Sequence, residues 1–308
     1  MEQITLGRTS LQVTVAGLGC GGHSRLGIEK RGLDHAASIV RTAYDEGINF
    51  FDTATIYGTQ AAVGKGLEGV PRDKYVLSTK FNYKDKLPGD LAKSLDESLK
   101  DLKTDYIDVY HLHGVRPEDY SAVRDTYVPI MQKAKQEGKI RFLGITEMFG
   151  QDTPHDMLKV SLPEDLFDVI MVGYNILNPS AGKTILPLAR EKNVGVLCMF
   201  AVRSALSNPE QLKTDIGRIL EHGQADPAIV KPDGALDFLT REKAADSIMD
   251  AAYRFCRHTQ GIHVVLTGTS NSNHLKENIA SILKPELPKN ILIRLEEMFG
   301  SVDCVSGQ

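Results

Sequence analysis

The sequence predicts a single α/β domain over residues 1–308, folded as an eight-stranded parallel barrel of the (β/α)8 or TIM type. Eight short apolar runs, each of the length of a buried strand, recur along the chain. Longer amphipathic segments separate them, and this alternation is typical of parallel strands joined by right-handed helical crossovers. No hinge-like linker interrupts the 308 residues, and one barrel of this type takes about 250 residues.

The expected strands share a high content of Val, Ile, Leu and Phe, as strands buried on both faces do. They span residues 15–20, 48–54, 74–80, 106–114, 140–146, 167–175, 195–200 and 263–268. An N-terminal β-hairpin is expected over residues 4–14, before the first of them. The helical segments between strands include residues 35–47, 89–102, 122–138, 184–193 and 243–261, several of which end in the Gly or Asn that suits a helix C-terminus.

An open, doubly wound sheet is the alternative architecture. It would use the glycines of residues 17–22, GLGCGG, as a dinucleotide-binding turn. That run matches G-x-G-x-x-G poorly, and no helical pattern follows it directly, as the motif requires. Eight strand-helix units also close more naturally into a barrel.

The connection after the seventh strand is unusually long and covers residues 202–240. Within it, residues 208–223 carry helix signals: Asn208 as N-cap, Pro209 at the first helical position and Gly223 at the end. The remainder, residues 224–240, is expected to form a flap over a ligand, because long insertions at the C-terminal face of a barrel often do so.

Composition argues for a small-molecule partner. The chain is 42% hydrophobic and 25% charged with a net charge of −4, and no block of Lys and Arg suggests nucleic acid or a membrane surface. No apolar run approaches the roughly 18 to 20 residues of a membrane span, and no signal peptide is evident, so a cytoplasmic location is expected. The four cysteines form no Cys-x-x-Cys pair and are expected to be reduced thiols. Nothing in the sequence indicates the oligomeric state.

Ionisable residues stand where three expected strands end. Side-chain alternation puts Asp52 on the inward face of the second strand, Lys80 on that of the third and His113 on that of the fourth. They are about 30 residues apart, one strand-helix unit, so they should lie side by side at the C-terminal mouth of the barrel, where such enzymes place reactive groups. Lys80 can neutralise Asp52, which makes a buried carboxylate tolerable there.

Tyr57, in the loop after the second strand, is close enough to fold back over that pair. A phenol has a pKa near 10. An ammonium about 4 Å away, at an effective dielectric constant near 20, would favour the phenolate by roughly 4 kcal/mol, or about three pKa units. We therefore expect Tyr57 to exchange protons near neutral pH as a general acid and base.

Four stretches, in this order, resemble the aldo-keto reductase superfamily over nearly the whole chain. They are INFFDTATIYG at 48–58, LSTK at 77–80, YIDVYHLHG at 106–114 and GKIRFLGIT at 138–146. The resemblance implies a catalytic tetrad of Asp52, Tyr57, Lys80 and His113. It also implies hydride transfer between the nicotinamide of NADP(H) or NAD(H) and a small carbonyl or alcohol substrate such as an aldehyde, ketone or sugar.

The same resemblance implies a cofactor site after the first, fifth, seventh and eighth strands. Its candidates are Cys20, Gly21, Thr146, Arg203, Gly268, Thr269, Ser270, His274, Glu277 and Asn278. Gly268 and His274 stand where basic residues often bind the 2′-phosphate of NADP, so NAD is a candidate cofactor. Thr146-Glu147, Met171 and Met199 replace the Ser-Asn pair, Gln and aromatic residue that usually hold the nicotinamide, and Phe200 adjoins Met199. These replacements suggest the branch with the aldose and galactose dehydrogenases.

Three other interpretations remain open. His111 and His113 could be metal ligands, but no partner ligands are evident, and His111 is better explained as a hydrogen-bonded core residue. Lys80 could form a Schiff base in a lyase, although Asp52 would raise its pKa and oppose this. A cofactor-binding regulatory protein, like the potassium-channel beta subunits that resemble this family, is the third.

Overall fold

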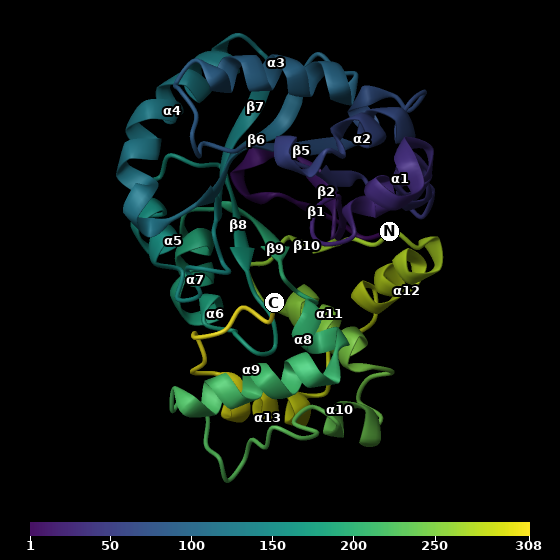
Figure 1. The fold of residues 1–308 in the computed structure, drawn as a ribbon, viewed down its shortest axis with the longest axis vertical. Helices are drawn as coiled ribbons and strands as arrows, with labels where there is room; N and C mark the ends of the chain where they lie inside the picture. Colours follow the sequence, from purple (N-terminus) through teal and green to yellow (C-terminus); the bar gives the residue numbers. More distant parts are fainter.

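The predicted barrel is confirmed by the computed structural model, which describes residues 1–308. Eight parallel strands close on themselves in the order β10-β3-β4-β5-β6-β7-β8-β9 (Figure 1). Their bounds are β3 Ala16–Gly19, β4 Phe50–Asp52, β5 Val76–Phe81, β6 Ile107–Val115, β7 Ile140–Glu147, β8 Val169–Gly173, β9 Gly195–Met199 and β10 Val264–Thr267. Pairing of β10 with β3 closes the ring, which excludes the open sheet.

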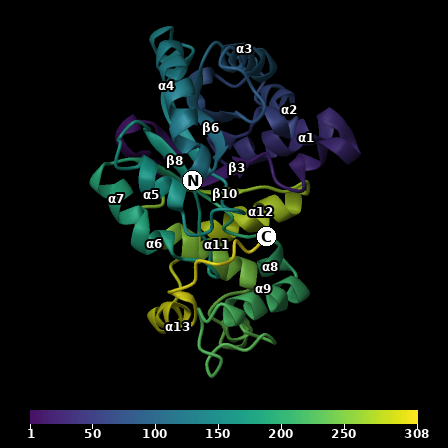
Figure 2. The same cartoon turned by 60° about the vertical axis from the view of Figure 1, so that its left-hand side comes forward.

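Helices surround the strands, as Figures 1 and 2 show from two directions. The longer ones are α1 Ile28–Asp45, α3 Asp90–Leu102, α4 Tyr120–Gln136, α9 Pro209–Glu221, α11 Ile248–His258, α12 Ser272–Ile282 and α13 Lys289–Phe299. The shorter ones are α2 Gln60–Gly66, α5 Asp156–Ser161, α6 Ala181–Thr184, α7 Leu186–Glu191, α8 Ser204–Ser207 and α10 Phe238–Arg241. None of them combines the length and hydropathy needed to cross a membrane.

Local capping explains where the helices differ from expectation. The segment expected to begin at residue 243 begins at α11, because the Ser247 side chain accepts a hydrogen bond from the amide of Asp250. The segment expected over 184–193 is divided into α6 and α7 beside Pro187, which lacks an amide hydrogen for a continuous helix. Helix α9 begins as predicted, with the Asn208 side chain accepting from the amide of Glu210.

The expected hairpin, β1 Gln3–Thr5 paired with β2 Gln12–Thr14, plugs the N-terminal end of the barrel. Leu6, Leu11 and Val13 belong to the same buried cluster as the inward-facing side chains of the strands, such as Phe50 and Val109. Close packing extends to the backbone, since a Cβ at Gly195 would lie 2.8 Å from Leu6 Cγ. With this end filled by leucine and valine, the chemistry is confined to the opposite end.

Residues 224–240 do not form the expected flap. None of them lines the cavity at the barrel mouth. Val230, Leu236 and Phe238 are buried instead in a second apolar cluster with Ile216 of α9 and Leu295 of α13. Figures 1 and 2 both place this group of elements to one side of the barrel. The segment carries enough apolar side chains to build a core with α9 and α13, and burying them there is more favourable than leaving them over a water-filled cavity.

Truncating the hairpin plug should destabilise the whole barrel. We expect Leu6→Ala to lower the free energy of unfolding by about 2 to 5 kcal/mol, because the fully buried side chain would leave a cavity. Urea titration followed by circular dichroism measures the change. Leu87→Ala is the control, since Leu87 is 73% exposed and its loss should change stability by less than about 0.5 kcal/mol. Equal stability of both variants would contradict a plugging role.

Candidate active site

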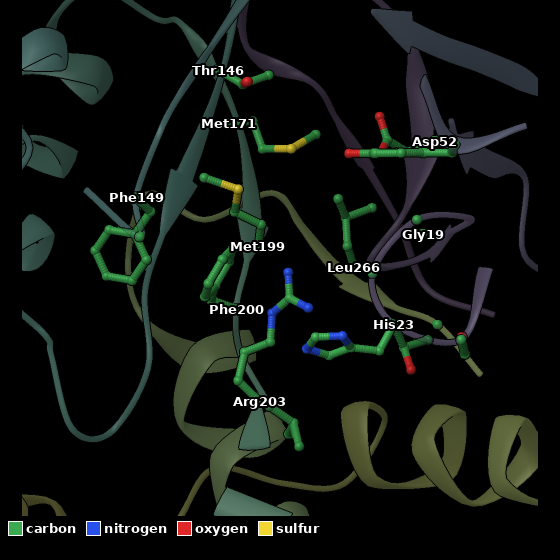
Figure 3. A pocket seen from close by; sticks show the side chains of 18 of the residues that line it. Gly19, His23, Asp52, Thr146, Phe149, Met171, Met199, Phe200, Arg203 and Leu266 are labelled. Atoms are coloured by element: carbon green, nitrogen blue, oxygen red, sulfur yellow. The ribbon is translucent and has the colours of Figure 1, made fainter. Parts of the chain in front are cut away.

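A cavity of about 900 Å³ opens at the C-terminal ends of the barrel strands. Its lining comes from the C-terminal ends of the barrel strands and from segments that follow most of them, and this is where the fold places reactive groups. Figure 3 shows Met171, Met199 and Phe200 along one wall with Asp52 on the facing side. Arg203 and His23 reach toward each other across the cavity from separate segments.

A buried ion pair lies beneath the cavity. Lys80 Nζ is 2.6 Å from Asp52 Oδ2 and 2.7 Å from the carbonyl oxygen of Thr53, and both charged side chains are at most 5% exposed. The Ser78 hydroxyl donates to the other Asp52 oxygen at 2.7 Å. Register explains the meeting, because Asp52 pairs with Ser78 across β4 and β5. The pair predicted from side-chain alternation is therefore present, with each charge compensated.

Tyr57 and His113 lie over this pair. The Tyr57 hydroxyl is 3.1 Å from His113 Nε2, and Lys80 Nζ is 5.0 Å from the centre of the Tyr57 ring. Gly21 leaves room for the Tyr57 ring, since a Cβ at Gly21 would lie 2.5 Å from that ring. The structure thus brings together all four residues of the expected tetrad, with Asp52, Tyr57 and His113 lining the cavity and Lys80 below.

The expected shift of the Tyr57 pKa toward neutral pH is wrong. Burial raises the pKa of Tyr57 above its ordinary value, and the attraction of Lys80, which lowers it, does not compensate. The reason is that the Lys80 charge is already neutralised by Asp52 at 2.6 Å. Tyr57 is accordingly a protonated phenol at neutral pH. Lys80 is placed to stabilise negative charge on its oxygen as a proton leaves.

The two histidines and Lys80 are held in defined protonation states. Burial, reinforced by the Lys80 charge, lowers the pKa of His113 to about 3, so this imidazole is neutral. His111, one layer deeper, is buried and shares a 3.0 Å hydrogen bond with the Ser78 hydroxyl, as a core residue should. Burial lowers the pKa of Lys80, but Asp52 outweighs it and the pKa stands above its ordinary value. A charged, fully buried lysine is unsuited to Schiff-base formation.

Most of the expected cofactor residues line the same cavity. They are Gly21, Thr146, Arg203, Gly268, Thr269, His274, Glu277 and Asn278. A Cβ at Gly268 would overlap the carbonyl of Gly19, so only glycine lets these two segments approach. The Thr146 hydroxyl accepts from the amide of Gly114 at 2.7 Å.

Cys20 and Ser270 do not line it. Cys20 is fully buried in the cluster between barrel and helices, because it alternates with the cavity-lining Gly19, and burial raises the pKa of its thiol. Ser270 faces α1, where its carbonyl accepts from His35 Nε2 at 2.8 Å. The next residue, Asn271, caps α12 with its own side chain.

Arg203 is the one arginine of the cavity lining, and it has no carboxylate partner. Its guanidinium carbon lies 3.9 Å from the centre of the Phe200 ring, and its Nη1 is 3.2 Å from where a Cβ of Gly22 would be. Burial lowers its pKa. A partly buried cation over a glycine turn, without a counter-ion, is suited to a bound phosphate.

Several lining residues were not anticipated. His23, Asn82, Lys84, Phe149 and Met249 come from loops and from α11. The rule that loops after barrel strands surround the site would have pointed to their segments, but no pattern singles out the residues. Met249 is at the start of α11, which the sequence shows only as an amphipathic helix.

Comparison with known proteins gives a consistent result. A model of the aldo/keto reductase family matches residues 18–298. L-galactose dehydrogenase of Arabidopsis thaliana is 33% identical over 302 residues, 93% of this chain and 89% of that protein. D-threo-aldose 1-dehydrogenase of a Pseudomonas species is 28% identical over 302 residues, 86% and 88% of the two chains. An aldo/keto reductase of Klebsiella pneumoniae, solved with NADP and acetate, superposes with a TM-score of 0.72 at 19% identity over 99% and 98% of the chains.

The neutral state of His113 predicts a pH effect on stability. In the unfolded chain this histidine is protonated below about pH 6.5, whereas in the folded protein it is protonated only below about pH 3. The free energy of unfolding should therefore fall as the pH is lowered from about 6.5 to about 3. We expect His113→Gln to flatten the dependence by at most about 1.4 kcal/mol per pH unit. Urea midpoints at successive pH values test it. Parallel curves for the two proteins would show that His113 is protonated equally in both states.

Proposed function

Because this chain belongs to the aldo/keto reductase family of oxidoreductases, we propose that it catalyses nicotinamide-dependent oxidation of a sugar at its anomeric hydroxyl, and the reverse carbonyl reduction. The observation that carries the proposal is the Tyr57 hydroxyl, 3.1 Å from His113 Nε2 and above the Lys80–Asp52 pair at the cavity. The sugar is inferred from two relatives named as L-galactose dehydrogenase and D-threo-aldose 1-dehydrogenase.

A nicotinamide nucleotide fits the residues of the cavity. Arg203, which lacks a counter-ion, would hold the diphosphate, and Thr269 and Asn278, which also line the cavity, would contact the adenosine. Gly21 and Gly268 leave room for close approach. When bound, the nicotinamide accepts or supplies the hydride.

The side chains supply the accompanying proton transfer. In carbonyl reduction Tyr57 gives its hydroxyl proton to the carbonyl oxygen, and in oxidation its phenolate form takes the proton of the substrate hydroxyl. Lys80 stabilises the phenolate that reduction leaves, and Asp52 keeps Lys80 oriented through the 2.6 Å contact. Neutral His113 holds the substrate oxygen by a hydrogen bond without competing for the proton.

We further propose that the protein prefers NAD(H) to NADP(H). The cavity lining contains one lysine, Lys84, and one arginine, Arg203, and neither belongs to the segment 268–278. That segment contributes the carboxylate of Glu277 to the lining. Glu277 forms no ion pair that would neutralise it. A 2′-phosphate at this end would meet a negative charge, whereas a free ribose hydroxyl could donate to it.

Removing the Tyr57 hydroxyl should abolish turnover and spare nucleotide binding. We expect Tyr57→Phe to lower kcat for aldose oxidation by at least about 10²- to 10⁴-fold, the usual contribution of a general acid or base. Formation of NADH absorbance measures turnover, and fluorescence titration measures NADH affinity. Tyr44→Phe, on α1 outside the cavity lining, is the matched control. Wild-type turnover in Tyr57→Phe would remove this residue from the mechanism, whereas nucleotide binding without turnover in the wild type would leave a cofactor-binding regulatory protein as the better explanation.

Neutralising Glu277 should weaken discrimination between the two nucleotides. We expect wild-type protein to bind NADH more tightly than NADPH, and Glu277→Gln to narrow the ratio of dissociation constants by roughly tenfold, as loss of one repulsive contact does. Glu297→Gln, on α13 away from the cavity, should leave the ratio unchanged. Tighter binding of NADPH by the wild type would reverse the assignment.

A further inference from the structure

Glu147, which lines the cavity, and His155 form a fully buried couple at the cavity wall. Both carboxylate oxygens of Glu147 lie 2.9 to 3.0 Å from His155 Nδ1, and neither side chain is exposed. Glu147 is the last residue of β7, and its Oε1 also accepts from the amide of Gly173 in β8 at 2.7 Å. The tetrad does not use this couple.

The hydrogen bonds around His155 determine where its hydrogens are. Asn178 Nδ2 donates to the carbonyls of Thr153 at 3.1 Å and Val305 at 2.9 Å, so Asn178 Oδ1 is an acceptor. The Ser180 hydroxyl donates to that oxygen at 2.6 Å. Ser180 Oγ therefore offers only a lone pair to His155 Nε2 at 3.1 Å, and Nε2 must carry a hydrogen.

A second hydrogen lies between His155 Nδ1 and the carboxylate, because two acceptors would not approach to 2.9 Å. The couple then has no net charge, whichever atom the shared hydrogen is drawn on. Burial raises the pKa of Glu147, which favours retaining that hydrogen. An acid is thus accommodated beside the cavity without an unpaired buried charge.

The couple supports an aromatic wall. Phe149 lies flat on the His155 ring, with centroids 5.2 Å apart and planes at 10°, and its edge meets Phe200 at 5.3 Å and 86°. A Cβ at Gly173 would overlap the Phe149 ring, so the ring is confined from that side too. Phe200 in turn carries the Arg203 guanidinium 3.9 Å from its centre (Figure 3).

Phe200 needs this support because its backbone is strained. Its φ is 65°, in the left-handed region that a bulky side chain rarely adopts. The arrangement persists only where surrounding contacts hold it. Phe149 provides such a contact on the cavity side, and Phe149, Phe200 and Arg203 all line the cavity.

We propose that Glu147 and His155 are positioning residues for nicotinamide nucleotide binding, acting by holding Phe149 against Phe200 and thereby placing Arg203. The inference rests on the proposed function, since it assumes that the nucleotide occupies this wall. Neither residue touches the reacting atoms.

The test compares Glu147→Gln, His155→Gln and the pair combined. We expect each single variant to raise the dissociation constant for NADH roughly tenfold, about what one aromatic pair contributes, with kcat at saturating nucleotide much less affected. The double variant should bind NADH no more weakly than the worse single variant, because either substitution alone already removes the Glu147–His155 interaction. Phe149→Leu leaves the Glu147–His155 couple intact and should weaken NADH binding to a similar degree. It keeps the test valid if the variants at Glu147 and His155 fold poorly. His222→Gln, at an exposed site on the end of α9, is the matched control.

A second measurement needs no cofactor. In ¹⁵N-labelled protein, His155 Nε2 should carry a slowly exchanging hydrogen in wild type and in Glu147→Gln alike, because Ser180 Oγ still accepts from it. The hydrogen that wild type shares between Nδ1 and the carboxylate should be lost in Glu147→Gln, whose side-chain amide would donate to Nδ1 instead. A wild-type Nε2 without hydrogen overturns the inference. The inference is also overturned if the variants, including Phe149→Leu, bind NADH as tightly as wild type, even if their urea midpoints fall. Failure of the wild type itself to bind NADH or NADPH would instead refute the proposed function.

Discussion

The contact between Lys80 and Asp52 is the interaction on which the site depends. Either charge alone at this depth would be strongly unfavourable, so the two must be buried together. Parallel pairing of β4 with β5 places Asp52 and Lys80 on adjacent strands. The Ser78 hydroxyl and the Thr53 carbonyl supply the further hydrogen bonds of the pair. An ammonium held in this way keeps its charge, so its field can act on the one phenol above it.

That arrangement changes how the tyrosine acts. A free ammonium near a phenol would ionise it at rest, but one already paired with a carboxylate does not overcome burial. Tyr57 consequently stays protonated until a substrate oxygen takes the proton, at which point Lys80 stabilises the new negative charge. Preorganised charge aimed at the transition state lowers a barrier more effectively than one that has already altered the ground state. The neutral His113 completes the site, because it can hydrogen-bond the substrate oxygen while Tyr57 remains the group that transfers the proton.

Much of the site was predictable because a parallel barrel converts sequence spacing into position. Side-chain alternation was enough to place Asp52, Lys80 and His113 on the inward face, and the loop length brought Tyr57 over them. Alternation also explains the failure at Cys20, since it lies out of phase with Gly19 and therefore points toward the helices. The segment 224–240 failed for another reason: its apolar residues found partners on α9 and α13, which no local pattern reveals.

By itself the sequence determined the barrel, the hairpin that precedes it and the four residues at its mouth, because these follow from period-two alternation and strand-helix repetition. Only the tertiary structure decided the protonation of Tyr57, the isolation of Arg203 from any carboxylate and the burial of Glu147 against His155. Each of these depends on the depth of a group and on neighbours contributed by distant segments. Desolvation and partner distance are properties of the assembled molecule, and spacing along the chain does not encode them.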